Sequence, residues 1–203
     1  IRFATTLNFT LEPKLKTYIK KYANTLKKLS KDRKKEELDL IFSSPNKAYG
    51  IELLINLKLA DALDIPNLKK AKITPSMIVT WAQLNALDKY NFNVIEKESI
   101  NKINEIKDKN LLDNHTLYNY GLYICTMAAE LKDIDKRQIN EIYASMPIKT
   151  RLDIALSPTE ICEILKKEAG PFLKPLLSNL ENEILDGNIK NTKEDITRYI
   201  LNE

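Results

Sequence analysis

The side chains that could carry out chemistry are few, and most of them lie where a helix is expected to begin. Asp133-Ile-Asp135 is the only Asp-x-Asp pair, and two carboxylates at this spacing can share a magnesium ion when they lie on a strand. Here the pair lies between two predicted helices, where aspartate usually acts as a cap, and we favour that role. His115 is the only histidine and follows Asp113-Asn114 at a predicted helix start, so we expect it to cap or lie on the surface.

The remaining reactive groups also favour structural roles. Cys125 lies in an apolar helical pattern, which predicts a buried and unreactive thiol. Tyr118, Tyr120 and Tyr123 could stack on bases, but their helical spacing is more typical of a core. The four glycines are at least 17 residues apart, which excludes a glycine-rich phosphate loop, and no Cys-x-x-Cys pair indicates structural zinc. The residues alone therefore reveal no active site.

The composition indicates in which cellular compartment the protein is expected. The chain has 203 residues and a net charge of +4, and no apolar run approaches the roughly 18 residues of a membrane span. Two cysteines cannot build a disulfide framework. We therefore expect a reducing, cytoplasmic location without a membrane partner.

Positive charge is concentrated at the start of the chain. Residues 1–35 contain eleven basic and two acidic side chains, a local charge of +9, which leaves −5 for the remaining residues. Such a basic segment indicates a polyanion partner, although a solvated lysine-rich helix face would give the same pattern. Lysine outnumbers arginine by 27 to 5, which favours contacts to phosphate over readout of base edges and predicts no DNA specificity.

Apolar residues recur with helical spacing almost throughout, which predicts an all-α fold. One apolar stripe belongs to a single expected helix that Thr10 can cap. Its members recur at steps of three and four: Leu15, Tyr18, Ile19, Tyr22, Leu26 and Leu29. Lysines 16, 20, 27 and 31 lie away from this stripe and give the helix a basic outer face. Residues 1–9 are ambiguous, because their apolar residues fit both a strand and a helix.

Local signals mark several further helix ends. Ser30 is expected to open a helix over residues 31–42, and Thr74-Pro75 one that continues through Leu87. A continuous helix is expected over residues 117–131. Ser157-Pro158-Thr159-Glu160 has the spacing of a capping box, and Gly187 suits a left-handed helix terminus. The best internal boundary is the segment 64–74.

Two stretches together resemble class II tRNA nucleotidyltransferases, the bacterial CCA-adding enzymes and their poly(A) polymerase relatives. The first stretch is Ile1-Arg2-Phe3-Ala4, then Leu7-Asn8-Phe9-Thr10-Leu11-Glu12-Pro13, then Ser30, Asp32, Arg33 and Glu37, which is similar to the family's neck. The second is Met146-Pro147-Ile148-Lys149-Thr150, Ala169-Gly170-Pro171-Phe172 and Asp186-Gly187-Asn188-Ile189-Lys190-Asn191, which is similar to its tail.

The resemblance implies neck-like helices at residues 1–65, body helices at 66–146 and tail helices at 147–203. Enzymes of this family carry an N-terminal head, in which a Gly-Ser pair and two carboxylates hold Mg²⁺ for transfer from CTP or ATP. This segment contains no Gly-Ser pair and no Glu-Asp-x-x-Arg motif. We therefore expect no cofactor and no metal site in it, and no catalysis without the head domain of its parent chain.

The resemblance also implies roles for particular residues. Asp32, Arg33 and Glu37 match positions that support the nucleotide pocket; alternatively, Arg33 and Glu37 only join adjacent helical turns. The expected partner is tRNA, bound through its backbone and shape. The expected RNA-binding residues are Lys16, Lys20, Lys27, Lys31, Lys149, Arg151, Lys166, Lys167 and Lys174. A helix start at Gly170-Pro171 could also offer N–H groups to a phosphate, or this pair could form only a turn.

Two alternatives remain at this point. The parent could be a poly(A) polymerase or an enzyme that adds only part of CCA, because the deciding residues lie largely in the head. A protein of another class, a helical interaction module without an RNA role, would use its lysines for solvation alone.

Overall fold

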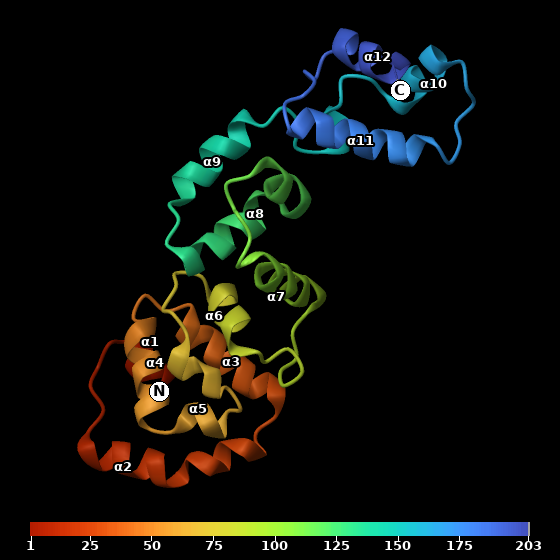
Figure 1. The fold of residues 1–203 in the computed structure, drawn as a ribbon. Helices are drawn as coiled ribbons and strands as arrows, with labels where there is room; N and C mark the ends of the chain where they lie inside the picture. Colours follow the sequence, from red (N-terminus) through yellow and green to blue (C-terminus); the bar gives the residue numbers. More distant parts are fainter. Residues whose placement is uncertain (203) are drawn as a thin grey trace. The chain divides into compact units, whose positions relative to one another are not determined.

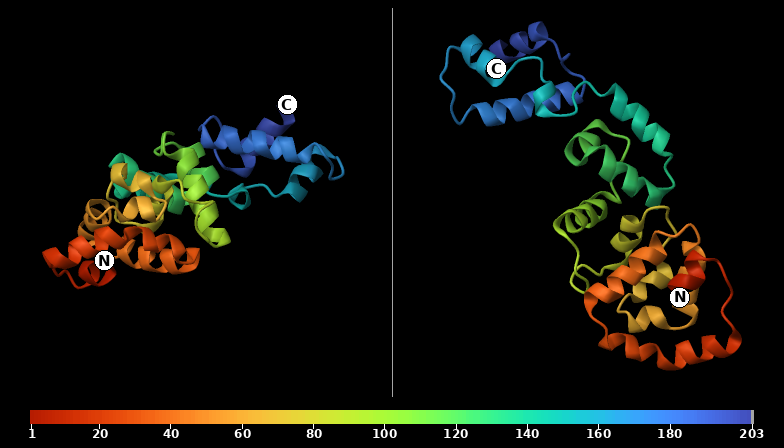
Figure 2. Two further views of the ribbon diagram at one scale, coloured as in Figure 1. Left: turned by 90° about the horizontal axis from the view of Figure 1, so that it is seen from below. Right: turned by 180° about the vertical axis from the view of Figure 1, so that it is seen from behind.

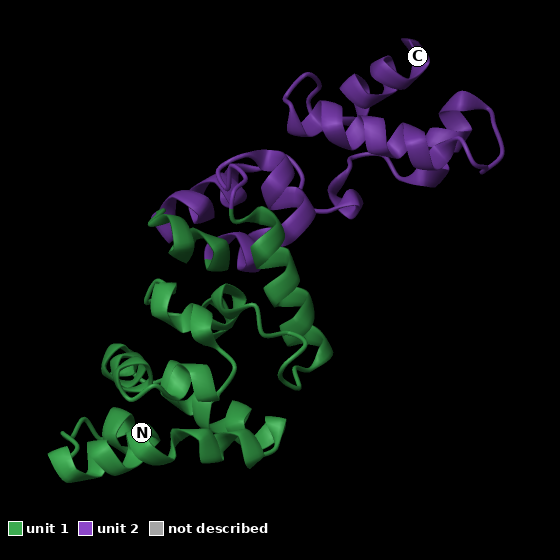
Figure 3. Cartoon of the chain, turned by 60° about the horizontal axis from the view of Figure 1, so that its bottom comes forward, with its two compact units in different colours: residues 1–107, 127–134 green, residues 108–126, 135–203 purple. Residues whose placement is uncertain are grey.

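The computed structural model describes residues 1–202, and within this range it contains helices and no strand, which confirms the predicted all-α fold. The chain forms two compact units (Figure 3). Unit 1 comprises residues 1–107 and 127–134, and unit 2 comprises residues 108–126 and 135–203. Segment 64–74, the internal boundary expected from the sequence, lies inside unit 1 and does not separate the two units. The division into neck, body and tail is a functional one and stays a prediction.

Unit 1 holds the basic start of the chain (Figure 1). Its complete elements are α1 (Arg2–Thr6), α2 (Pro13–Tyr22), the 3₁₀ helix η1 (Ala23–Lys28), α3 (Lys31–Phe42), α4 (Lys47–Asn56), α5 (Leu59–Ala62), the 3₁₀ helix η2 (Pro66–Lys70), α6 (Met77–Leu84) and α7 (Val94–Ile106). Helix α1 packs on α3 and α4 (Figure 2). Glycine allows this close approach, because a Cβ at Gly50 of α4 would lie 2.5 Å from Thr5 Oγ1.

Unit 2 begins within the stretch that leads into α8 (Asn114–Lys132), whose residues from Met127 onward belong to unit 1. Its complete elements are α9 (Lys136–Ser145), the 3₁₀ helix η3 (Arg151–Asp153), α10 (Pro158–Leu165), α11 (Leu173–Leu185) and α12 (Lys193–Asn202). Helix α10 packs on α12 (Figure 1).

Several predicted helix ends are confirmed in atomic detail. Ser30 Oγ accepts a hydrogen bond from the backbone N–H of Arg33 at 3.2 Å, at the start of α3. The capping box of α10 has both of its bonds, and the carboxylate of Glu160 accepts from the Ser157 backbone N–H at 2.8 Å. Gly187 follows α11 with a φ of 75°. These ends depend on contacts within four residues, which is why sequence spacing finds them.

Other local predictions are wrong. Thr10 does not cap α2, which begins at Pro13 with Glu12 as its N-cap. The apolar stripe was expected to lie on a single helix. In the structure α2 ends at Tyr22, and the chain continues as the 3₁₀ helix η1. The helix expected after Thr74-Pro75 runs only over Met77–Leu84.

The helix expected over residues 117–131 is interrupted at one glycine. Gly121 has φ 75° and ψ 163°, far from helical values. Glycine adopts this backbone conformation without the steric cost that a side chain would bring. The ambiguous segment at the start of the chain resolves as helix α1 over Arg2–Thr6.

Candidate nucleic-acid interface

Two arginines converge on one glutamate at the junction of α1 and α3. Arg2 Nε donates to Glu37 Oε2 at 2.7 Å, and Arg33 Nη2 lies 3.3 Å from Glu37 Oε1. Arg33 therefore does join adjacent turns of α3, as the simpler interpretation expects, but Arg2 adds a bond from another helix. Asp32 points elsewhere and accepts a hydrogen bond from Asn91 Nδ2 at 2.7 Å. The structure thus brings Arg33 and Glu37 together and leaves Asp32 out of the cluster.

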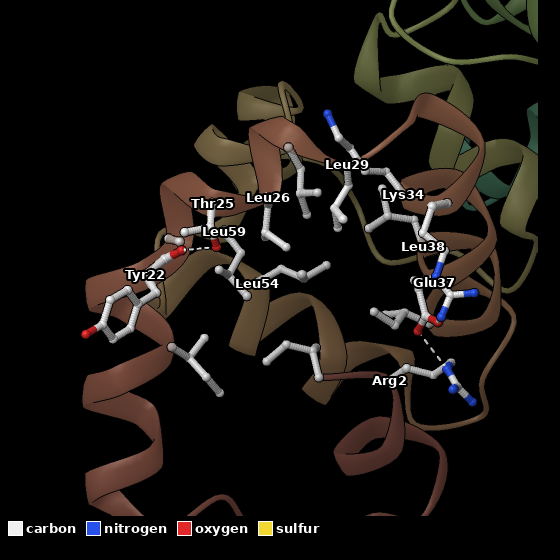
Figure 4. A pocket seen from close by; sticks show the side chains of 16 residues that line it. Arg2, Tyr22, Thr25, Leu26, Leu29, Lys34, Glu37, Leu38, Leu54 and Leu59 are labelled. Atoms are coloured by element: carbon white, nitrogen blue, oxygen red, sulfur yellow. Dashed lines mark hydrogen bonds and ion pairs between the residues drawn. The ribbon is translucent and has the colours of Figure 1, made fainter.

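This cluster lies at a cavity of about 460 Å³ in unit 1 (Figure 4). Leucine, isoleucine and alanine side chains form most of the wall. Its charged lining residues are Arg2, Arg33, Lys34 and Glu37. In Figure 4, Arg2 and Glu37 face one another across the dashed ion pair, while Leu26 and Leu54 belong to the apolar part of the wall. The cavity therefore combines an apolar interior with a charged edge.

The apolar stripe of α2 and η1 is the other wall of this cavity rather than part of a closed core. Ile19, Tyr22, Leu26 and Leu29 line the cavity. No residue of α2 is buried, and Tyr22 keeps 52% of its surface exposed. The predicted stripe therefore exists, but much of it remains accessible.

The predicted basic face of this segment is present on the surface. Lys20 and Lys27 are exposed, and Lys16 is half-buried. Lys31 is exposed as well, and its Nζ donates to the carbonyl of Asp88 at 3.1 Å. These four ammonium groups have no carboxylate partner among the residues that the structure describes. A polyanion would therefore meet them directly.

In unit 2, Arg151 is engaged by a buried carboxylate. Its Nε and Nη2 atoms donate to Glu181 at 2.6 and 2.7 Å, and Tyr118 Oη donates to the same carboxylate at 2.6 Å. The hydrogen bonds from Arg151 hold the pKa of Glu181 below its usual range. Desolvation, followed by the bond to Glu181, raises the pKa of Tyr118. Arg151 thus has a structural role in this fold, and its guanidinium is not free in the way the RNA-binding prediction assumes.

The predicted lysines of unit 2 lie at three separate places: before η3, just after α10 and on α11. Lys149 Nζ lies 5.3 Å from the centre of the Tyr143 ring, and Lys167 Nζ lies 5.5 Å from that of Phe172. Lys166 is the left-handed C-cap of α10, and Lys174 is exposed on α11. All four are exposed.

Gly170-Pro171 forms a turn rather than a helix start. Helix α11 begins at Leu173, and the backbone N–H of Leu173 donates to the carbonyl of Gly170 at 3.1 Å. The proposed phosphate contact therefore has no helix terminus at this pair.

Sequence reasoning overlooked Leu152, which is 93% exposed. It lies in a turn fixed by Asp153, whose Oδ2 accepts from the backbone N–H groups of Lys149 and Thr150 at 2.9 and 2.8 Å. These bonds hold the pKa of Asp153 below its usual range. Only its place two residues after the tail-like motif Met146–Thr150 could have drawn attention to it.

The reactive groups singled out from the sequence have structural surroundings. Asp135 accepts from the backbone N–H of Arg137 and caps α9. His115 Nε2 lies 2.7 Å from Asp186 Oδ1. Burial raises the pKa of the Cys125 thiol to about 11. In residues 1–202, no group of three or more metal-binding side chains is close enough to hold an ion, and none of the helices is long and apolar enough to cross a bilayer.

Comparisons with known proteins give matches along nearly the whole chain. A family model described as tRNA nucleotidyltransferase domain 2 matches residues 79–200. A second, described as "Probable RNA and SrmB- binding site of polymerase A", matches residues 8–72.

Curated relatives and a solved structure agree with these models. The chain is 25% identical to the CCA-adding enzyme of Bacillus cytotoxicus and 24% identical to that of Bacillus mycoides, over 98% of this chain and 58% of each relative. The fold matches the crystal structure of the Bacillus stearothermophilus CCA-adding enzyme in complex with CTP with a TM-score of 0.81 and 21% identity. That match covers 99% of this chain and 59% of the other. The chain thus spans a little under three fifths of the relatives' length.

Proposed function

We propose that this chain is the tRNA-holding part of a CCA-adding enzyme. The premise is that the chain belongs to the class II tRNA nucleotidyltransferase family and corresponds to its C-terminal portion. The observation that carries the proposal is the order of the two family matches, an RNA-binding module followed by nucleotidyltransferase domain 2. The exposed lysines of α2 and η1 support it, because phosphate contacts supply most of the affinity for a nucleic-acid backbone.

In this proposal the parent enzyme adds C, C and A to tRNA 3′ ends from CTP and ATP. The head domain would supply Mg²⁺ and the transfer chemistry, since residues 1–202 offer no cluster of metal-binding side chains. The described residues would hold the tRNA and support the nucleotide pocket. A cytoplasmic location follows from this role and belongs to the same proposal.

The Arg2–Glu37–Arg33 cluster gives the supporting role a physical form. Glu37 forms ion pairs with both arginines and so joins the start of α1 to α3. In this family the nucleotide-selecting motif directly precedes the segment that matches Ile1. Fixing α1 would therefore fix the position of that motif.

Arg33→Ala in the enzyme joined to its head domain is expected to raise the KM for CTP and ATP and to blur the choice between them. The expected change is a few-fold, because Arg2 keeps its bond to Glu37 and a pair of this kind contributes only a few tenths of a kcal/mol. Steady-state incorporation of each nucleotide measures it, with Arg198→Ala as a control. Unaltered KM values and unaltered nucleotide choice would remove Arg33 from the site.

The second candidate function is that of a poly(A) polymerase, which the description of the model for residues 8–72 favours. Supplying CTP and ATP separately to the complete enzyme distinguishes the two. A CCA-adding enzyme extends a tRNA lacking CCA only to its mature end, whereas a polymerase continues with ATP alone.

Charge reversal on the face of α2, η1 and the start of α3 tests the proposal against an interaction module without an RNA role. Replacing Lys20, Lys27 and Lys31 with glutamate is expected to weaken tRNA binding by at least roughly tenfold, because phosphate contacts are lost and repulsion is added. Filter binding or fluorescence anisotropy measures it.

A matched control keeps the overall charge change the same. Lys58, Lys97 and Lys190 are exposed and lie outside the predicted interface. Their reversal should cost clearly less affinity. Equal tRNA affinity of the wild type and the Lys20, Lys27 and Lys31 variant would favour the interaction module.

A further inference from the structure

A polar groove in unit 1 combines positive charge with amide groups. It has a volume of about 530 Å³ and lies where η2, α6 and the end of α7 meet. Lys70 and Lys107 bring its charges, and Asn67, Gln83, Asn85 and Asn104 bring its amides. None of these residues was singled out from the sequence, and no carboxylate lines the groove.

The two lysines differ from the neighbouring lysines in having no ion-pair partner among the described residues. Lys69 pairs with Asp61 at 2.8 Å, and Lys72 pairs with Asp133 at 2.5 Å. Other hollows with basic residues contain a carboxylate of their own, such as Glu37 in the cavity beside α3 or Asp195 in a hollow of unit 2. The groove therefore presents uncompensated positive charge, which favours an anionic ligand.

Two of the amides, those of Asn104 and Asn67, are held in place and still have hydrogen-bonding capacity, whereas Gln83 donates both amide hydrogens to the carbonyls of Lys72 and Val79. Asn104 Nδ2 donates to the carbonyl of Ala82 at 3.0 Å, and Asn67 Nδ2 donates to that of Leu84 at 3.3 Å. Each bond uses one of the two amide hydrogens and leaves the second, together with the amide oxygen. The same bonds cover carbonyls at the C-terminal end of α6, which would otherwise repel an anion.

We infer that this groove binds the ribose–phosphate backbone of the RNA, an inference that rests on the proposed function. Lysine ammonium groups contact phosphates as point charges, and amide side chains donate to phosphate and sugar oxygens. An amide that both donates and accepts also matches the 2′-hydroxyl, the group that distinguishes RNA from DNA. The groove thus extends the RNA-binding surface of unit 1 beyond the basic face of α2 and η1.

The test is a double variant, Lys70→Gln with Lys107→Gln, titrated with tRNA at several salt concentrations. Loss of two phosphate contacts should lower the slope of log affinity against log salt by about 2 and weaken binding by roughly tenfold or more at low salt. The control is Lys58→Gln with Lys97→Gln, which removes the same charge from exposed positions outside the groove. Thermal unfolding checks that both variants fold.

The possible outcomes distinguish failure of the groove inference from failure of the proposed function. If the wild type binds tRNA and both double variants lose the same affinity, only net charge matters and the groove inference is overturned while the proposed function stands. A wild type that does not bind tRNA overturns both.

Lysine acetylation followed by mass spectrometry gives a second measurement. Bound tRNA should protect Lys70 and Lys107 at least several-fold more than Lys58. Equal modification of all three lysines in the complex would contradict the inference even if the affinities differ.

Discussion

Replacing Trp81 with alanine should destabilise unit 1 by about 3–5 kcal/mol, the usual cost of removing a buried aromatic side chain. Trp81 is 1% exposed and contacts the rings of Phe42, Tyr90 and Phe92 at centroid distances of 5.1–5.3 Å. Its indole N–H also donates to Asp39 at 2.7 Å. Alanine would leave a cavity and remove this bond. Chemical denaturation followed by circular dichroism measures the free energy of unfolding.

Two variants define what this result means. Tyr123→Ala removes an aromatic side chain that is 56% exposed, and a surface change of this kind should stay within about 0.5 kcal/mol. Trp81→Phe keeps an aromatic ring but lacks the N–H donor, so its cost should fall between the two. A Trp81→Ala protein as stable as Tyr123→Ala would show that the cluster does not hold unit 1 together.

The aromatic cluster matters for function because it joins α3 to α6. Asp39 of α3 accepts from Trp81 and also pairs with Lys35, whose Nζ reaches Glu96 of α7 at 2.8 Å. Helix α3 carries Arg33 and Glu37 on its first turns. The rings thus fix the element that presents the proposed pocket support.

Sequence alone predicted the helix starts at Ser30 and Ser157 correctly, but not those expected at Thr10 and Thr74-Pro75. Ser30 and Ser157 act on backbone groups three residues away, so the information is contained in a few neighbouring positions. The break at Gly121 was missed because a lone glycine within an apolar run is compatible with a continuous helix. The backbone there has φ 75° and ψ 163°, which glycine adopts readily but which the apolar pattern around it does not predict.

The apolar stripe of α2 shows the limit of periodicity. Spacing correctly assigns Ile19, Tyr22 and Leu26 to one face. It does not say whether that face meets a close-packed neighbour or a cavity, because the answer depends on where α4 and α5 lie. The cavity was therefore beyond prediction from this segment.

The candidate site was predicted in part, and through resemblance rather than spacing. Arg33 and Glu37 are four residues apart and do lie together. Arg2 is 35 residues from Glu37, so only the folded chain reveals it as the third member. The same distance effect applies to Arg151, whose partner Glu181 is 30 residues away.

Binding of tRNA to this chain should fall by roughly a thousandfold when salt rises from about 50 to about 200 mM, if about six lysines contact phosphates. Of the predicted contacts in unit 1, Lys20, Lys27 and Lys31 are exposed and Lys16 is half-buried, and all four predicted lysines of unit 2 are exposed. Contacts of this kind release counterions, so the logarithm of the affinity falls linearly with the logarithm of the salt concentration. Fluorescence anisotropy with deacylated tRNA gives the slope.

The slope also distinguishes how the RNA is held. Arg151 is bonded to Glu181 and should contribute no counterion release, so Arg151→Lys should leave the slope unchanged even if it destabilises unit 2. Duplex DNA of similar length should bind more weakly, because the predicted contacts depend on the backbone shape of RNA and its 2′-hydroxyls. A shallow slope with equal DNA affinity would mean that few phosphates are contacted and that the basic start of the chain serves solvation alone. A steep slope with a preference for tRNA requires the lysines of α2 and η1 to meet phosphates in a fixed geometry.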